Sequence, residues 1–158
     1  MRSANGQIYE PLLTALLATP YFKIPAPKST GRESFNRAWL DENLHRLSST
    51  IAPNDVQATL MELTAITIAN SINGLSQSSK EIFACGGGAY NTALMQRLTA
   101  LLSKDTVAST AALGVDPQWI EAMAFAWLAQ QTINHQPGNL CEVTGAKREV
   151  ILGGVYYA

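Results

Sequence analysis

Three glycines between an expected strand and an expected helix are the residues of this sequence best suited to hold a ligand. Gly86, Gly87 and Gly88 follow the short apolar run at 82–85, and a helix is expected to begin near Asn91. Glycines let the backbone approach a ligand closely, and a helix N-terminus offers unpaired N–H groups and a positive dipole end. The pattern suits the sugar and phosphates of a nucleotide; the alternative is a tight turn without a ligand. Neither GxGxxG nor GxxxxGK[ST] occurs, which excludes the standard dinucleotide and P-loop sites.

Two further places could bind a substrate. The polar loop at 28–33, KSTGRE, combines two cations, two hydroxyls and a carboxylate, and it follows a proline-rich stretch that begins at residue 20. Lys28 and Arg32 are candidate partners of an anionic or polyhydroxy ligand, although a solvated loop is the simpler interpretation. Glu121 lies near the start of an otherwise apolar helix, where a carboxylate also complements the helix dipole.

Other chemistries find less support in the sequence. His45 and His135 lie far apart, with no HExxH motif and no nucleophile near them. Cys85 and Cys141 form no CxxC pair, and the segment 74–78 lacks the second glycine of a nucleophile elbow. We therefore assign no metal site and no catalytic residue to these positions.

Composition restricts the class of protein. The 158 residues favour a single domain over 1–158. A net charge of -1 offers no basic excess for nucleic acid, and the longest apolar run, 122–129, is too short for a membrane span. The first residues lack the apolar run of a signal peptide, and two unpaired cysteines suit a reducing compartment. We expect a cytoplasmic protein with no nucleic-acid and no membrane partner.

The elements that must position the candidate residues are mostly helices. Apolar periodicity predicts helices that begin at Pro11, Ser34, Asn54, about Asn91 and Asp116, and short strands at 82–85, 106–109 and 150–152. Three prolines predict an extended segment at 20–27. The strand, helix and strand over 82–109 predict a parallel unit with a right-handed crossover.

Caps and buried stripes complete this interpretation. Ser34, Asn54 and Asp116 are the expected N-caps. The last helix is expected to bury a stripe that comprises Ile120, Met123, Ala124, Trp127 and Leu128, and all three tryptophans, Trp39, Trp119 and Trp127, are expected in the core. So few strands cover these helices poorly and leave an unpaired edge. Either the fold is mostly helical or a partner sheet is missing from the chain.

Five motifs together resemble one family. They are PKSTGRE at 27–33 with FN at 35–36 and WL at 39–40, DVQATL at 55–60 with LTA at 63–65, CGGGA at 85–89 with Asn91, EAMAFAWLA at 121–129, and PGNL at 137–140 with VTGA at 143–146. In this order and spacing they resemble the anhydro-N-acetylmuramic acid kinases. The match spans nearly all of the chain but only the later, smaller part of the family pattern.

The resemblance implies a fold and an activity. The fold is a helix-rich α/β lobe of the actin-like, hexokinase-like ATPases (ribonuclease-H-like), with a short parallel sheet whose first strands are absent. The family uses ATP and Mg²⁺ to hydrolyse the 1,6-anhydro bond of an amino sugar and to phosphorylate O6, giving N-acetylmuramate 6-phosphate in cell-wall recycling. Its members are typically homodimers. The phosphate-binding segment and the general base belong to the missing N-terminal lobe, so we expect the chain alone to be inactive.

The resemblance also assigns residues. Gly86 to Gly88 match the family's nucleotide-binding turn. Asn91 matches an asparagine beside that turn, and we expect it to cap the helix that follows. Glu121 matches a carboxylate on the sugar side of the cleft, and Lys28 and Arg32 lie in a matching polar loop, so we expect all three to contact the substrate.

Departures from the family pattern are few, and two alternatives stay open. Tyr90 stands where histidine is common and can alter base stacking, while Thr92 and Cys141 stand where proline is common. The alternatives are a non-catalytic module that binds nucleotide or dimerises, and a lobe of another actin-like ATPase. The long motif around Glu121 argues against the second.

Overall fold

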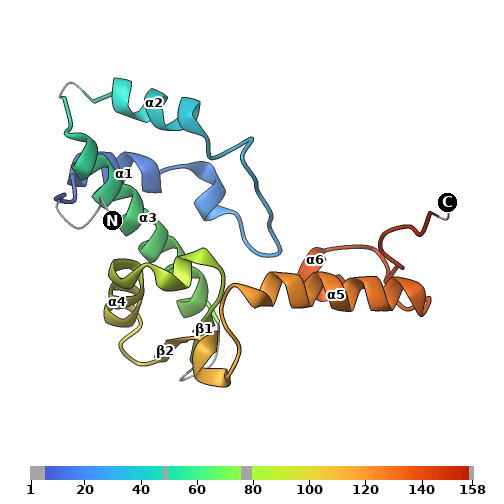
Figure 1. Cartoon of the computed structure of the whole chain (residues 1–158). Coiled ribbons are helices and arrows are strands. Elements are labelled where there is room, and N and C mark those ends of the chain that lie inside the picture. The colour runs from blue at the N-terminus through green and yellow to red at the C-terminus, as the bar shows by residue number, and fades with distance from the viewer. Residues whose placement is uncertain (1–5, 48–49, 76–79, 157–158) are drawn as a thin grey trace.

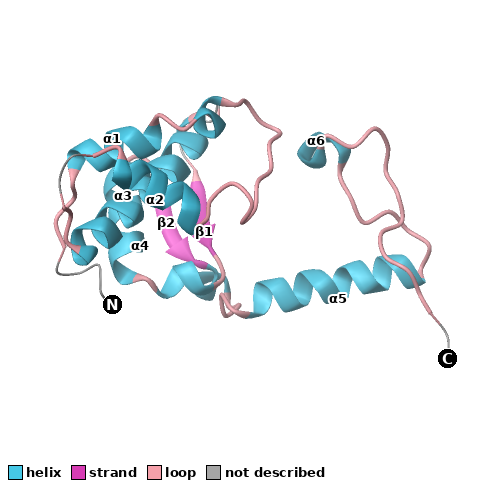
Figure 2. Ribbon diagram, turned by 90° about the horizontal axis from the view of Figure 1, so that it is seen from above, coloured by secondary structure: helices cyan, strands magenta, loops and turns pink. Residues whose placement is uncertain are grey.

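The chain is described by a computed structural model that covers residues 6–47, 50–75 and 80–156 (Figure 1). Its elements in order are α1 Glu10–Leu17, η2 Pro20–Lys23, α2 Arg37–His45, α3 Pro53–Asn73, β1 Glu81–Ala84, η3 Gly87–Tyr90, α4 Thr92–Leu101, β2 Thr106–Ser109, η4 Thr110–Leu113, α5 Trp119–Ile133 and α6 Cys141–Thr144. The elements up to η4 form a packed body, and α5 extends away from it (Figures 1 and 2).

Helix α3 joins two apolar clusters of the body. Leu63, in the middle of α3, packs with Leu12, Leu13 and Leu16 of α1. Further along the helix, Ala65 and Ala69 pack with the buried leucines at the end of α4, Leu98 and Leu102. Each cluster excludes apolar surface from water, so the 21-residue α3 connects the helical end of the body to the sheet.

The predicted parallel unit is confirmed. Strands β1 and β2 pair in parallel, from Glu81 opposite Thr106 to Ala84 opposite Ser109, with α4 as the connection. The strand bounds match the prediction at 106–109, and β1 lies one residue earlier than expected. The described part of the chain has a two-stranded sheet, so the helix-rich α/β class is confirmed at this coarse level.

A bidentate ion pair fixes α4 on α3. Arg97 Nε and Nη2 donate to the Glu62 carboxylate at 2.7–3.0 Å, and Glu62 is 3% exposed. Hydrogen bonding to that carboxylate raises the pKa of Arg97. A buried carboxylate is stable only when it is paired in this way, so the two helices have a specified register.

The proline-rich segment differs from the prediction over its first residues. Pro20–Lys23 forms the 3-10 helix η2 instead of an extended strand-like segment, and the extended backbone starts at Ile24. Proline is well tolerated in a first helical turn. The turn brings Tyr21 and Phe22 against Phe35, with ring centroids 5.4 and 5.3 Å apart, and this aromatic packing favours the compact conformation.

The predicted N-caps Ser34, Asn54 and Asp116 are wrong. Helix α2 is capped by Asn36, whose side chain accepts from the Trp39 N–H, and not by Ser34. Helix α3 begins at Pro53, so Asn54 already lies inside the helix. Proline at the first position fixes that start. Asp116 lies before α5, and its carboxylate closes a local turn instead.

The C-terminal part differs most from the prediction. No residue of α5 is buried, so the expected stripe is wrong, and Trp119 and Trp127 are 65% and 51% exposed. Trp39 packs against the first apolar cluster as expected. The expected strand at 150–152 is not formed: Val150 exchanges hydrogen bonds with the loop residues Gly138 and Asn139. A strand needs a neighbouring strand, and none of the described residues provides one here.

Candidate functional site

The glycine turn lies at the carboxyl end of β1 and has one open face. Gly86 has φ 72° and ψ −172°, a conformation open almost only to glycine. Its N–H donates to the Pro117 carbonyl at 2.8 Å, which ties the turn to the segment before α5. A side-chain carbon added at Gly86 or Gly87 would meet no atom within 4 Å. The turn is therefore held from behind and is free to receive a ligand in front.

Asn91 lies at the N-terminus of α4, where sequence analysis expected a helix start. Its side-chain oxygen accepts from the Leu94 N–H at 3.2 Å, so it is the N-cap of α4. Thr92 is the first helical residue. The positive end of the helix dipole, where a negative group is stabilised, therefore follows the glycine turn along the chain, after η3.

Tyr90 and Asp116 form a second tie across the turn that sequence reasoning missed. The Tyr90 hydroxyl donates to Asp116 Oδ1 at 2.7 Å, and the same oxygen accepts from the Gln118 N–H at 2.9 Å. The bond from Tyr90 lowers the pKa of Asp116, and the bond from Gln118 lowers it further. The bond to Asp116 in turn raises the pKa of Tyr90. Asp116-Pro117 also suits a helix cap, so the sequence held no signal for this pairing.

The edge of the sheet beside this turn contains a buried hydroxyl without a partner. Thr110, directly after β2, is 8% exposed, and its Oγ1 has no hydrogen-bond partner among the described residues. Buried polar atoms are rarely left unsatisfied. Because β1 and β2 are parallel, Thr110 and Gly86 follow the same edge of the sheet, where ligands of open α/β sheets bind.

The polar loop is ordered by its own contacts. Lys28 Nζ donates to the Tyr21 carbonyl at 3.1 Å and lies 4.7 Å from the Tyr21 ring centroid. Glu33 accepts from the Gly31 N–H at 2.7 Å. Arg32 is exposed. Within the described chain, no hydrogen bond or ion pair links Lys28 or Arg32 to the glycine turn.

The loop does approach a distant segment. A side-chain carbon added at Gly145 would lie 3.4 Å from Cγ of Pro27, which places two of the sequence motifs side by side. Glu121 lies in the first turn of α5 and is exposed. Along the chain, Glu121 is closer to the glycine turn than the polar loop is.

The remaining histidines and cysteines of the described chain lie apart in sequence from the glycine turn and the polar loop, except for Cys85 directly before the turn. The described residues contain no group of three or more His, Cys, Asp or Glu placed to hold a metal ion. His45 Nδ1 lies 2.6 Å from the Asp41 carbonyl, and Cys85 and Cys141 are free thiols. Among the helices described, none is both long and apolar enough for a membrane crossing.

Comparison with known proteins decides the family. The family model described as anhydro-N-acetylmuramic acid kinase matches residues 1–158. The chain belongs to this family. A relative from Saccharophagus degradans, named anhydro-N-acetylmuramic acid kinase, is 49% identical over 152 residues, which cover 96% of this chain and 41% of the relative. This confirms the resemblance carried by the five motifs.

Further relatives with the same name show the same partial coverage. One from Coxiella burnetii is 48% identical and is covered over 41% of its length. One from Pseudomonas syringae pv. tomato is 51% identical and is covered over 43%. The chain therefore spans about two fifths of the length of the curated relatives that it matches.

Proposed function

We propose that this chain is the nucleotide-side lobe of an ATP-dependent kinase that acts on 1,6-anhydro-N-acetylmuramic acid. The carrying observation is the open glycine turn, Gly86 to Gly88, at the carboxyl edge of β1 in a chain that belongs to this kinase family. Asn91 and the N-terminus of α4 follow this turn along the chain. The reaction would cleave the 1,6-anhydro bond with water and transfer the γ-phosphoryl group of ATP to O6 of the sugar. The proposed product is N-acetylmuramate 6-phosphate, made in the cytoplasm during cell-wall recycling.

This chain's own contribution to catalysis would be to bind and orient the nucleotide. The fixed backbone at Gly86 and the free space over Gly87 allow a ribose and phosphates to approach closely. The positive end of α4 stabilises negative charge at the same place. Phosphoryl transfer depends mainly on positioning and on electrostatic stabilisation. Magnesium would neutralise charge on the phosphates, and its protein ligands would come from the part of the relatives that this chain does not span.

The substrate side of the proposal involves three residues. Glu121 and Arg32 are exposed, and no ion pair holds either of them within the described chain. Lys28 is held at Tyr21 but stays at the surface. We assign Glu121, Lys28 and Arg32 to the amino sugar, in an actin-like ATPase fold whose general base and remaining strands belong to the N-terminal lobe. We also propose, separately from the catalytic roles, that the protein forms a homo-oligomer.

Release of ADP tests the proposal. The chain is mixed with ATP, Mg²⁺ and the anhydro sugar, alone and together with a separately produced N-terminal lobe of a relative. We expect activity in the mixture and little or none from the chain alone, because losing positioned acid–base catalysis costs about 10²–10⁴ in rate. Phosphorylation by the chain alone would contradict the assignment of the general base to the other lobe.

A second candidate function is a non-catalytic module that binds nucleotide or dimerises. The open face of the glycine turn supports nucleotide binding and does not by itself require turnover. The family match argues against a lobe of another actin-like ATPase. Suppose that this chain and the N-terminal lobe of the relative are both folded, that their mixture releases no ADP, and that ATP still binds the glycine turn. That result would support the non-catalytic module.

A further inference from the structure

Helix α5 exposes a large apolar surface. Its exposed large side chains are Trp119 (65%), Met123 (52%), Phe125 (64%), Trp127 (51%) and Ile133 (68%). The helix leaves the body after the segment that follows η4 and extends away from it (Figures 1 and 2). None of its residues is buried, although the C-terminal segment lies against its second half. Monomeric proteins rarely expose contiguous apolar surface on this scale, and such surfaces mark interaction sites.

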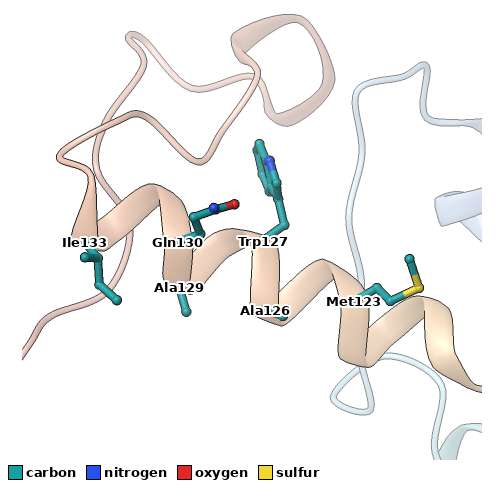
Figure 3. A pocket seen from close by; sticks show the side chains of 6 residues that line it. All are labelled: Met123, Ala126, Trp127, Ala129, Gln130 and Ile133. Carbon is teal, nitrogen blue, oxygen red and sulfur yellow. The ribbon is translucent and has the colours of Figure 1, made fainter.

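The apolar surface is not confined to one side of the helix. Met123, Trp127 and Ile133 line a shallow hollow with Ala126, Ala129 and Gln130, yet Trp127 and Ile133 point to opposite sides of α5 (Figure 3). Phe125 and Leu128 line a second hollow, which the C-terminal segment 152–155 closes on its other side. A helix that is apolar all round belongs in the interior of a larger protein. At 15 residues it is also too short to cross a bilayer.

The occupant that fits this surface is the rest of the family polypeptide. The Saccharophagus and Coxiella relatives are each covered over 41% of their length, so more than half of their polypeptide lies outside the match. A two-fold contact with a second copy uses the same single patch on each copy, whereas exposed apolar side chains of α5 point to opposite sides of the helix (Figure 3). The two-stranded parallel sheet also indicates that further polypeptide packs on this chain, because parallel sheets normally occur within larger sheets that are covered on both faces.

We propose that α5, together with residues 152–155, is the surface on which the other part of an anhydro-N-acetylmuramic acid kinase docks, so that α5 becomes an interior helix of the complete protein. This docking surface and the proposed function have one premise in common, namely that the chain works as part of a larger protein. The docking requires neither nucleotide at the glycine turn nor turnover, so a failed kinase assay leaves it standing.

Thiol labelling tests whether α5 is covered. Phe125→Cys is placed in a Cys85→Ser, Cys141→Ser background, and its labelling rate is measured in the isolated chain and in a chimera. The chimera is the Saccharophagus relative with this chain in place of its matched 152 residues. We expect labelling in the chimera to be slower by about tenfold or more, since a covered site reacts only when it opens. Thr99→Cys, on the exposed face of α4, is the control and should react alike in both proteins.

Two results would overturn the proposal. One is equal labelling of Phe125→Cys in the folded chimera and in the isolated chain. The other is slow labelling already in the isolated chain that becomes slower with protein concentration, which would make a second copy the occupant.

A binding measurement covers the case in which the chimera does not fold. The wild-type chain is mixed with the remaining polypeptide of the relative, with neither ATP nor sugar, and a one-to-one complex is expected by light scattering. Joint substitution of Phe125→Glu and Trp127→Glu should weaken it by about tenfold or more, because burying two carboxylates in an apolar contact is costly. Thr99→Glu should leave it unchanged. No complex, or one that resists the α5 substitutions, would contradict the proposal.

Discussion

Gly86 and Gly87 are neighbours in the turn, yet they are constrained for different reasons. Glycine is required at position 86 because of the positive φ there. It is not required for lack of space, since a side-chain carbon at Gly86 would meet no atom within 4 Å. We expect Gly86→Ala to lower the free energy of unfolding by about 1–3 kcal/mol, the usual cost of forcing such a conformation. Gly87 has no positive φ, so Gly87→Ala should change the free energy of unfolding by less than about 0.5 kcal/mol. Urea denaturation of both variants measures the difference.

The same pair tests the ligand. A methyl group at Gly87 projects into the open face of the turn, where we propose that the nucleotide binds. Gly87→Ala should therefore keep the fold and weaken ATP binding by about tenfold, or 1.4 kcal/mol, as measured by titration calorimetry. Unchanged ATP affinity in Gly87→Ala would place the nucleotide elsewhere.

Tyr90 and Asp116 predict a pH dependence at both ends of the range. The lowered pKa of Asp116 means that its contribution to stability is present above its ordinary pKa and is lost as pH falls through the lowered value. The raised pKa of Tyr90 means that the bond is present below the ordinary tyrosine pKa and is lost as pH rises through the raised value.

Removal of the Tyr90 hydroxyl checks this coupling. In Tyr90→Phe, the pKa of Asp116 should move up toward its ordinary value, because the first cause of its lowering is the bond from Tyr90. Carboxyl NMR titration measures it. Tyr156→Phe, at a residue that is 95% exposed, is the control and should leave that pKa where it was. An unmoved pKa in Tyr90→Phe would show that the bond does not form in solution.

Single-residue predictions from sequence succeeded where the chemistry was local. Asn91 caps α4 as its position indicated, because an Asn side chain reaches the N–H groups of the turn that follows it. Asp116 is not the N-cap of α5: its carboxylate accepts from the Gln118 N–H and from the hydroxyl of Tyr90, which lies 26 residues earlier. A contact over that distance depends on the fold and leaves no local pattern.

At the level of elements, the Glu62–Arg97 pair determines how α4 stands on α3. Arg97→Met would leave the carboxylate of Glu62, 3% exposed, without its partner. We expect a loss of about 3 kcal/mol in the free energy of unfolding, typical of a broken buried pair. Thermal and urea unfolding both report it.

Two companion variants separate pairing from packing. Adding Glu62→Met to Arg97→Met should recover most of the loss, because an apolar pair of similar size no longer buries a charge. Arg37→Met removes the exposed i,i+4 pair with Asp41 and should cost less than about 1 kcal/mol. Equal losses for Arg97→Met and Arg37→Met would mean that burial of Glu62 does not determine the energetics.

Helices and strands were predicted correctly where the described chain also contains the residues that they pack against. The strand–helix–strand unit is complete within residues 81–109, and its type and order were correct. We expected the apolar stripe of α5 to be buried and the apolar run at 150–152 to form a strand. Among the described residues, nothing buries α5 and no strand pairs with 150–152. The sequence pattern indicates the environment that a segment requires, and the described residues do not supply that environment to α5.

At the scale of the whole molecule, the chain combines a packed body with a bare helix, and the two should differ in local stability. Helix α5 has 15 residues and no buried side chain, whereas α4 has 10 residues and buries Leu98 in the second apolar cluster. Isolated helices of about 15 residues are marginal in water, since most helical stability in proteins comes from tertiary packing. We expect amide hydrogen exchange to be faster in α5 than in α4 by about 10-fold or more, although α5 is the longer helix. In the chimera with the Saccharophagus relative, exchange in α5 should slow to the level of α4. Protection of α5 equal to that of α4 in the isolated chain would mean that the helix is already covered, and it would contradict this division into body and bare helix.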